Sequence, residues 1–388
     1  MAEFVNGNRI TLLKSGVEYF PALAAEFDAA QREIHLETYI YEDDIAGRTI
    51  AAALARAAQR GVATYVMVDG FGSKDLGSDL IEGLRGAGVR FLVYRPDISP
   101  WTLRRARLRR MHRKVAVIDA RVAFVGGINI IDDMHTPKHT PPRFDYAVRI
   151  DGPLVARIHR VVKRLWALVT ATQFKSAWPR LRDLGPFTVP RGGQRAAFVV
   201  RDNVAHRGDI EQAYLAAIRR ARSEILIASA YFFPGMSFRR ALTDAAARGV
   251  RVILLLQGRV EYVLLHYASR ALYGAFLDAR IEIHEYHQSF MHAKVAVIDR
   301  HWATVGSSNI DPFSFLLARE ANVVIEDGDF AGELRESLLA AIAKGAVQVR
   351  RESWAAQPLA VRALTWTSYG LARFLTGVFA YGRAREFT

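Results

Sequence analysis

A ten-residue segment occurs twice in this chain, and this repeat constrains the fold more than any other feature of the sequence. The first copy, MHRKVAVIDA, begins at Met111, and the second, MHAKVAVIDR, begins at Met291, 180 residues later. Among the first nine residues of the two copies, only Arg113 and Ala293 differ. Both copies extend to the same longer pattern, H-x-K-x4-D-x6-G-[GS]-x-N. We therefore expect two similar halves.

The flanking sequences predict the same order of elements around each copy. An apolar strand is followed by a helix and two further strands, at 33–36, 49–60, 64–68 and 89–94 in the first half and at 224–227, 238–248, 252–256 and 281–286 in the second. Each helix ends in Arg-Gly-Val, where Gly61 and Gly249 suit the residue after a helix. Strands that alternate with helices predict an α/β architecture, with helices on both faces of the sheet.

The length and composition agree with two halves. The chain has 388 residues, of which 51% are hydrophobic, so each half can bury a core. Residues 185–193 are rich in proline and glycine and mark a boundary. We predict a first half at 1–190, a second half at 191–357 and a C-terminal segment at 358–388.

The charge and the absence of cysteine narrow the possible functions. The chain has no cysteine, which excludes disulfides and cysteine-ligated metal sites and fits a reducing compartment. The net charge is +14, so we expect an anionic partner: nucleic acid, an acidic membrane surface or a phosphorylated small molecule. The first residues lack the pattern of a signal peptide, and we do not expect secretion.

The repeated motif carries groups that suit a phosphate. If residues 112–118 form a strand, His112 and Lys114 share one face. A hairpin then brings back a Gly-Gly pair, which allows close backbone approach to a ligand, and an amide at Asn129. A nucleophile or base, a cation and an amide donor thus lie together. One His-x-Lys pair is a weak signal, but two complete copies are a strong one. The candidates are His112, Lys114, Gly126, Gly127 and Asn129, with His292, Lys294, Gly306, Ser307 and Asn309.

The acidic residues of the region are expected to have two different roles. Asp119 and Asp299 are interpreted as strand-end residues that accept backbone hydrogen bonds, in preference to direct contact with substrate. A catalytic histidine needs an orienting acceptor on its second nitrogen. We assign Asp145 to His112 and Glu320 to the histidine of the second copy, because each acid opens an apolar strand after its motif. The alternative is that both acids are surface carboxylates.

No metal or other cofactor is expected. The sequence has no H-E-x-x-H or comparable ligand spacing. His135 and His139 lie in an inserted loop at 134–142, where a metal ligand role is possible, but we interpret them as loop residues.

The duplicated motif resembles the signature of the phospholipase D superfamily, which is met in full twice. Within that family the chain is most similar to the bacterial cardiolipin synthases, particularly the short type without N-terminal membrane helices. Less specific support comes from the stretches at 37–41, 230–234 and 306–312.

The resemblance implies a fold and a mechanism. The fold would consist of two α/β/α halves, each with a mixed sheet, related by a pseudo-twofold axis around one shared pocket. The site would therefore be complete within one chain. His112 would attack the phosphodiester and form a phosphatidyl-histidine, and His292 would act as acid and then base. The phosphate oxygens would be held by Lys114, Lys294, Asn129 and Asn309.

The preferred function is phosphatidyl transfer that makes cardiolipin from phosphatidylglycerol and a second phospholipid, on an anionic membrane. We expect peripheral attachment to the cytoplasmic side of the bacterial inner membrane. No segment is predicted to span a membrane. The C-terminal run after residue 358 is either an interfacial amphipathic helix or a helix packed on the domain. The basic run at 101–110 is either a lipid-phosphate site or a solvated loop.

Two alternatives remain at this stage. A hydrolase or a nucleic-acid phosphodiesterase of the same superfamily would use the same motif, although the sequence has no RNA-binding aromatic signature and we expect no nucleic-acid partner. A non-catalytic lipid- or nucleic-acid-binding protein is disfavoured because both motifs are intact.

Overall fold

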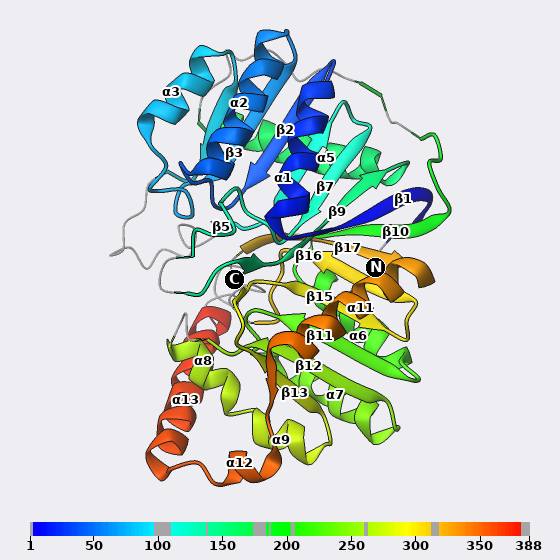
Figure 1. The fold of residues 1–388 in the computed structure, drawn as a ribbon, viewed down its shortest axis with the longest axis vertical. Coiled ribbons are helices and arrows are strands. Elements are labelled where there is room, and N and C mark those ends of the chain that lie inside the picture. The colour runs from blue at the N-terminus through cyan, green and yellow to red at the C-terminus, as the bar shows by residue number, and fades with distance from the viewer. Residues whose placement is uncertain are drawn as a thin grey trace.

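The computed structural model consists of two similar halves joined edge to edge (Figure 1). It describes residues 3–96, 110–136, 139–173, 184–185, 188–202, 206–259, 263–311 and 318–381. Most of the predicted basic run at 101–110 lies outside these residues, so only Arg110 of that run is placed.

The first half contains the elements labelled β1 to α5 in Figure 1. Its strands are β1 (Val5–Lys14), β2 (Glu33–Thr38), β3 (Ala63–Asp69), β4 (Arg90–Tyr94), β5 (Arg110–Met111), β6 (Lys114–Ile118), β7 (Val122–Gly126), β8 (Arg143–Phe144) and β9 (Tyr146–Asp151). Its helices are α1 (Ser15–Ala29), α2 (Ile45–Gln59), α3 (Ser78–Gly86) and α5 (Leu154–Thr172).

The second half repeats this order and adds elements at its C-terminal end. Its strands are β10 (Gln194–Arg201), β11 (Glu224–Ser229), β12 (Arg251–Gln257), β13 (Glu282–Tyr286), β14 (Phe290–Met291), β15 (Lys294–Ile298), β16 (Trp302–Gly306), β17 (Ala318–Glu326) and β18 (Ala346–Gln348). Its helices are α6 (Asp209–Arg220), α7 (Met236–Ala247), α8 (Val263–Arg270), α9 (Tyr273–Asp278), α11 (Gly328–Gly345), α12 (Arg351–Ala355) and α13 (Leu359–Tyr381).

One mixed sheet runs through both halves. Its strand order is β18-β13-β12-β11-β15-β16-β17-β10-β1-β9-β7-β6-β2-β3-β4, and apart from β18 the order mirrors itself about the β10–β1 pair. In the first half β2, β3 and β4 are parallel, whereas β6, β7 and β9 pair antiparallel. The predicted duplicated α/β fold with a mixed sheet is confirmed. The division at residue 190 stays a prediction, because β1 and β10 continue the sheet across it.

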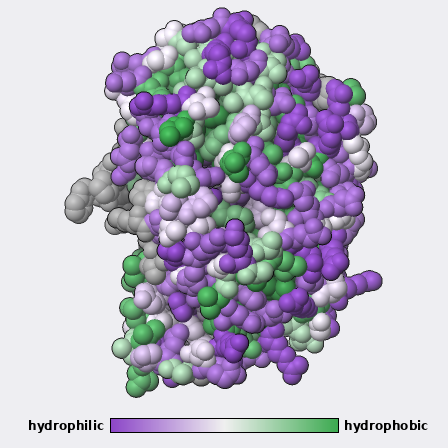
Figure 2. Space-filling model, in the orientation of Figure 1, coloured by the Kyte–Doolittle hydropathy of each residue, from purple (hydrophilic) through white to green (hydrophobic). Residues whose placement is uncertain are grey.

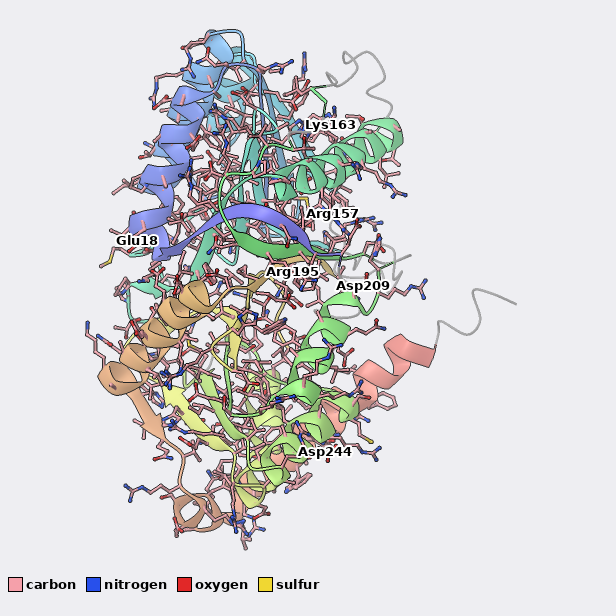
Figure 3. All side chains as sticks on the ribbon, turned by 90° about the vertical axis from the view of Figure 1, so that its right-hand side faces the viewer. Glu18, Arg157, Lys163, Arg195, Asp209 and Asp244 are labelled. Carbon is pink, nitrogen blue, oxygen red and sulfur yellow. The ribbon has the colours of Figure 1, made fainter. Side chains whose placement is uncertain are left out.

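Helices cover both faces of this sheet. In Figure 3, α1, marked by Glu18, and α5, marked by Lys163, lie on opposite sides of the first half. In the second half α11 lies on the side of α1, and α6 and α7, marked by Asp209 and Asp244, lie on the other side. The helices that follow β9 and β17 therefore cover opposite faces, as a twofold relation between the halves requires.

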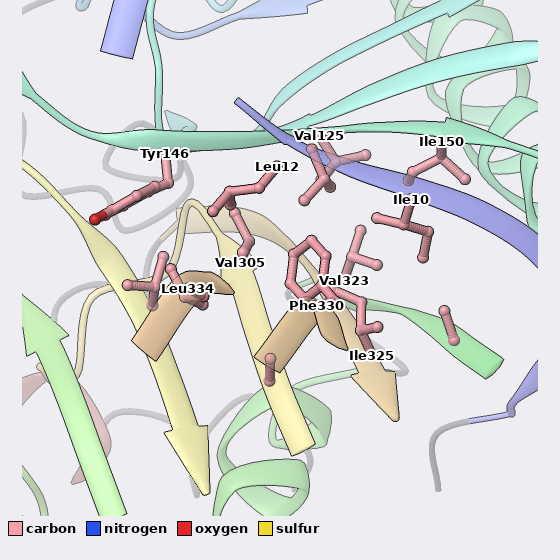
Figure 4. Close-up of a cluster of buried hydrophobic side chains, with 14 of the residues drawn as sticks. Ile10, Leu12, Val125, Tyr146, Ile150, Val305, Val323, Ile325, Phe330 and Leu334 are labelled. Carbon is pink, nitrogen blue, oxygen red and sulfur yellow. The ribbon is translucent and has the colours of Figure 1, made fainter. Parts of the chain in front are cut away.

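The largest apolar core lies where the halves meet (Figure 4). Inward-facing residues of β1, β7 and β9 pack against residues of β16, β17 and α11, and the labelled ones are Ile10, Leu12, Val125, Tyr146, Ile150, Val305, Val323, Ile325, Phe330 and Leu334. All are buried. Each such side chain contributes about 1.5–3 kcal/mol when it leaves water, so the two halves stabilise each other as one unit.

The prediction of one continuous strand over 112–118 is wrong. The strand is interrupted at His112 and Arg113, with β5 before the interruption and β6 after it, and the second copy is interrupted in the same way. The reason is tertiary: β6 pairs within its own half, whereas β5 pairs with β17 of the other half.

The C-terminal helix α13 packs against α8 and presents a second, apolar face to solvent. Thr365, Ser368 and Ala372 are buried at helical spacing, and Tyr369 packs on Phe233. The exposed apolar residues of α13 are 44% to 80% exposed: Leu359, Leu364, Trp366, Leu371 and Phe374. Figure 2 shows hydrophobic side chains along the lower left edge, where Figure 1 places α13. Among the described helices, none combines the length and apolarity that a membrane crossing requires.

Candidate active site

Each motif histidine is held by backbone contacts with the other half. The backbone N–H of His112 donates to the carbonyl of Arg319 at 3.0 Å, beside the β5–β17 pair. In the same way, the N–H of His292 donates to the carbonyl of Phe144 at 2.8 Å, beside the β8–β14 pair. The two residues that accept these bonds directly precede Glu320 and Asp145 in the sequence.

The predicted pairing of histidines with acids is therefore wrong: the pairs cross between the halves. The Nδ1 atom of His112 lies 3.0 Å from Oε1 of Glu320, and Nδ1 of His292 lies 2.8 Å from Oδ2 of Asp145. Both carboxylates are buried. Because each histidine backbone is bonded to the strand segment of the opposite half, the nearest acid is the one at the start of that segment. In both pairs Nδ1 meets the acid, and Nε2 has no acid partner among the residues that the structure describes.

The two motif lysines fold back onto the motif. Nζ of Lys114 donates to the carbonyl of His112 at 2.6 Å and lies 5.3 Å from the ring centre of Tyr39. Nζ of Lys294 bonds to the carbonyl of His292 and lies 3.4 Å from Oδ2 of Asp145. Both lysines are buried. Two amino groups are thus fixed beside the two histidines.

Burial shifts the pKa values of the titratable side chains in this site. It lowers the pKa of His112 and lowers that of His292 well below its ordinary value, where the charge of Lys294 adds to the effect. Burial also lowers the pKa of Lys114 to about 7, lowers that of Lys294 and raises the pKa of the Asp145 carboxyl. The charges of the two halves act on one another, so the site behaves as one coupled group.

The glycine pair and its counterpart fit their carboxylates. A Cβ at position 127 would lie 2.4 Å from Oδ1 of Asp145, so only glycine leaves room for that acid. In the second half the corresponding Ser307 donates to Glu320 and accepts the N–H of Ala321 at 3.1 Å. These glycine and serine contacts serve packing and orientation, and the expected close approach of a ligand at this pair stays a prediction.

The two motif asparagines differ. The side-chain oxygen of Asn129 accepts the N–H of Ile40 at 3.1 Å. The side-chain oxygen of Asn309 is buried and has no hydrogen-bond partner among the described residues. Their predicted contact with phosphate oxygens stays a prediction.

The motif aspartates make backbone contacts away from the histidines. The carboxylate of Asp119 accepts the N–H groups of Gln31, Arg32 and Glu33. Asp299 accepts the equivalent three N–H groups, from residues 222–224. Each aspartate thereby ties the end of its hairpin to the start of the neighbouring strand.

Sequence reasoning missed Tyr39 as a neighbour of the site. Its ring centre lies 4.6 Å from that of His112, and the ring also faces Lys114. The residue lies in the 37–41 stretch that supports the family resemblance, which was the available signal. Its neighbour Glu37 forms a buried ion pair with Arg113, the residue at which the two motif copies differ.

Comparison with known proteins identifies the family. The family model described as "Cardiolipin synthase, PLD-like domain" matches residues 23–166 and 214–341, one segment in each half. The chain belongs to the phospholipase D superfamily. Among phospholipase D relatives, cardiolipin synthase B of Escherichia coli (strain K12) is 42% identical over 343 residues, which are 88% of this chain and 82% of that protein. The cardiolipin synthase of Geobacillus kaustophilus is 32% identical over 320 residues, which are 82% of this chain and 63% of that protein.

A solved structure matches nearly the whole fold. The phosphatidylserine synthase of Haemophilus influenzae Rd KW20 superposes with a TM-score of 0.71 over 95% of this chain and 94% of its own, at 13% identity. That likeness shows the fold alone. The family match and the 42% identity show that this chain is a cardiolipin synthase-like enzyme of the phospholipase D superfamily.

Proposed function

We propose that this enzyme transfers a phosphatidyl group through a phosphatidyl-histidine intermediate, making cardiolipin from phosphatidylglycerol and a second phospholipid. The observation that carries the proposal is the crossed arrangement of His112 with Glu320 and His292 with Asp145, because each acid fixes Nδ1 and leaves Nε2 for chemistry. Similarity to cardiolipin synthase B supports the choice of lipid substrates.

In the first step of this proposal, Nε2 of His112 attacks the phosphorus of a phospholipid. The bond from phosphorus to the headgroup oxygen breaks, and His292 gives its proton to that oxygen. The side chain of His112 is the more exposed of the two, 16% against 10%, which supports its role as the nucleophile. Lys114 and Lys294 offset the charge that develops on the phosphate oxygens, with Asn129 and Asn309 as further donors.

In the second step, a hydroxyl of phosphatidylglycerol replaces the histidine. His292 takes the proton of the hydroxyl, the oxygen attacks phosphorus, and the bond from phosphorus to nitrogen breaks. The proton given in the first step is thereby recovered, so the cycle needs no external acid, base or oxidant. Burial favours neutral imidazoles in the empty site, and the anionic phosphate, once bound, favours the protonated form of His292.

The lipid product provides the decisive test. Purified protein is incubated with vesicles that contain phosphatidylglycerol, and the lipids are analysed by mass spectrometry. We expect cardiolipin from the wild type and from His206→Ala, a surface control, but none from His112→Ala or His292→Ala. Release of phosphatidic acid without cardiolipin would favour the hydrolase alternative. Cleavage of DNA or RNA in a parallel assay, without lipid turnover, would favour the nuclease alternative.

A second experiment tests the nucleophile. The His292→Ala variant is mixed with a p-nitrophenyl phosphatidate, whose leaving group needs no proton. We expect a stable phosphatidyl adduct on the peptide that contains residue 112. An adduct on residue 292 in the His112→Ala variant, with none in the converse experiment, would reverse the assignment.

The exposed face of α13 supports peripheral attachment to an anionic membrane. Its apolar side chains would enter the lipid interface, and the net charge of +14 favours anionic lipid. Because the opposite face of α13 packs on the core, point substitutions test this better than deletion. We expect Leu371→Glu/Phe374→Glu to lose vesicle binding without loss of fold. Val17→Glu, at an even more exposed apolar position on α1, serves as the control. Unchanged vesicle binding would contradict the proposal.

A further inference from the structure

Three buried residues of the first half form a cluster of metal-ligating side chains away from the active site. Glu33 and His35 lie two residues apart on β2 and so share one face of the sheet. His159 reaches them from α5, which packs on that face. All three residues are buried. Four residues of strand, about 13 Å, separate Glu33 from Glu37, which lies behind the active site.

The ligand atoms converge. Nε2 of His159 contacts Oε1 of Glu33, and Nε2 of His35 lies 3.6 Å from the same oxygen. One ligand atom from each residue lies within 4.8 Å of the other two, and among the described residues this is the only such group of three. Two imidazoles and a carboxylate are donors that bind divalent transition metals.

The cluster also leaves polar atoms unsatisfied. Both ring nitrogens of His35 and Oε2 of Glu33 are buried and have no hydrogen-bond partner among the described residues. Buried polar groups in proteins are normally hydrogen-bonded, so these three atoms require an explanation. The ring of His35 stacks on the ring of Tyr65, with centroids 4.6 Å apart, and its Nε2 is the nitrogen that lies near Glu33.

The second half shows what replaces the cluster. Glu224 occupies the position of Glu33, since both begin the strand that pairs with the motif hairpin. Its partner is Arg335 of α11, whose guanidinium nitrogens lie 2.5 and 3.1 Å from the carboxylate. Arg335 corresponds to His159, because each lies seven residues after the glycine that follows β9 or β17, Gly152 or Gly328. The position of His35 is taken by Leu226. A fixed cation therefore neutralises this glutamate in the second half.

We propose that Glu33, His35 and His159 bind one divalent transition-metal ion, with Zn²⁺ as the best fit, and that this ion is a structural centre of the first half. Glu33 would bind through both oxygens and each histidine through Nε2, giving four donors. This arrangement uses Oε2 of Glu33 and a ring nitrogen of His35, neither of which has a hydrogen-bond partner within the described part of the chain. It also supplies the positive charge that Arg335 supplies in the second half. The chemistry at His112 and His292 does not involve the ion.

The test measures bound metal in the full chain, with any affinity tag removed. The protein is stripped with a chelator, equilibrated with Zn²⁺ and analysed by mass spectrometry for metal content. We expect one Zn²⁺ per chain, a higher unfolding midpoint with Zn²⁺ than without it, and visible absorption from four-coordinate Co²⁺ when Co²⁺ replaces Zn²⁺.

A variant that copies the second half separates loss of the site from loss of the fold. His35→Leu/His159→Arg recreates the Leu226 and Arg335 arrangement, so it should fold, bind no metal and show no midpoint shift with Zn²⁺. Two control variants should each retain one ion. The first is His284→Asn, which changes a histidine beside Glu282 outside the cluster. The second is His112→Ala/His292→Ala, which removes both active-site histidines.

Three outcomes would overturn the proposal. They are less than about a tenth of an ion per wild-type chain at saturating Zn²⁺, full metal content in His35→Leu/His159→Arg, and loss of the metal in His112→Ala/His292→Ala. The last result would place the ion in the active site.

Discussion

The two halves carry almost the same motif but support it with different residues. In the first half Arg113 forms a buried ion pair with Glu37 of β2. In the second half the corresponding residues are Ala293 and Ala228, which are also buried. The single difference between the nine-residue motif copies, Arg113 against Ala293, is therefore accompanied by a second difference at its partner position, Glu37 against Ala228. The two halves thus share the residues of the motif, whereas the residues that pack behind the motif differ between them.

The carboxylates show a second paired difference. Asp145 is short and lies against Gly127, where a Cβ would collide with it. Glu320 is one methylene longer and receives a hydrogen bond from Ser307. The length of each acid therefore fits the residue beside it, Gly127 for Asp145 and Ser307 for Glu320. The carboxylate that orients each histidine is thus held by different contacts in the two halves.

The largest expected effects test the crossed pairs. We expect Glu320→Gln and Asp145→Asn each to lower turnover by about 10²- to 10⁴-fold, because each histidine loses the acceptor that fixes its tautomer. With p-nitrophenyl phosphatidate, Glu320→Gln should reproduce the defect of His112→Ala, and Asp145→Asn that of His292→Ala, in rapid-mixing experiments. The opposite correspondence would contradict the crossed pairing, whichever histidine is the nucleophile.

The ion pair behind the first motif is expected to have the next largest effect, on stability. Arg113→Ala leaves the buried Glu37 carboxylate without its partner and should cost about 3–5 kcal/mol of unfolding free energy. The double variant Glu37→Ala/Arg113→Ala imitates the second half and should be more stable than Arg113→Ala alone. Urea unfolding measures both. A double variant that is as unstable as the sum of the two single variants would show that the two residues act independently.

The pH dependence is expected to reflect Lys114. Its pKa of about 7 means that the ammonium is present below that pH and is lost as the pH rises through it. In the proposed mechanism this charge binds the phosphate, so kcat/KM should fall toward tenfold per pH unit above about pH 7. Lys114→Arg, which stays charged, should move this decline to higher pH. A decline at the same pH in the arginine variant would assign it to another group.

The smallest expected effect concerns the support of Glu320. Ser307→Gly imitates the first half and removes one hydrogen bond to the carboxylate, worth about 1 kcal/mol, so turnover should fall by about five- to tenfold. Steady-state kinetics measures the loss. The complementary Gly127→Ser should be far more damaging, because its side chain would collide with Asp145. Equal effects of the two changes would mean that the halves tolerate side chains alike at this position.

The duplication, the α/β architecture and the motif residues of the candidate site could be predicted from the sequence alone. These follow from local order: the motif residues recur at fixed spacing, and apolar strands alternate with helices. The turn glycines were also predictable, and Gly61 and Gly249 have the positive φ expected of residues that follow a helix.

Which of these groups meet depends on the packing of the two halves. The crossing of Asp145 and Glu320 depends on β5 and β8 leaving their own half to pair with β17 and β14, and no local pattern encodes a contact between segments about 150–200 residues apart. For the same reason the convergence of His159 with Glu33 and His35 is invisible in the sequence, because it depends on which face of β2 the helix α5 covers. Spacing along a chain specifies neighbours on one element, whereas packing between elements specifies the partners of buried charges.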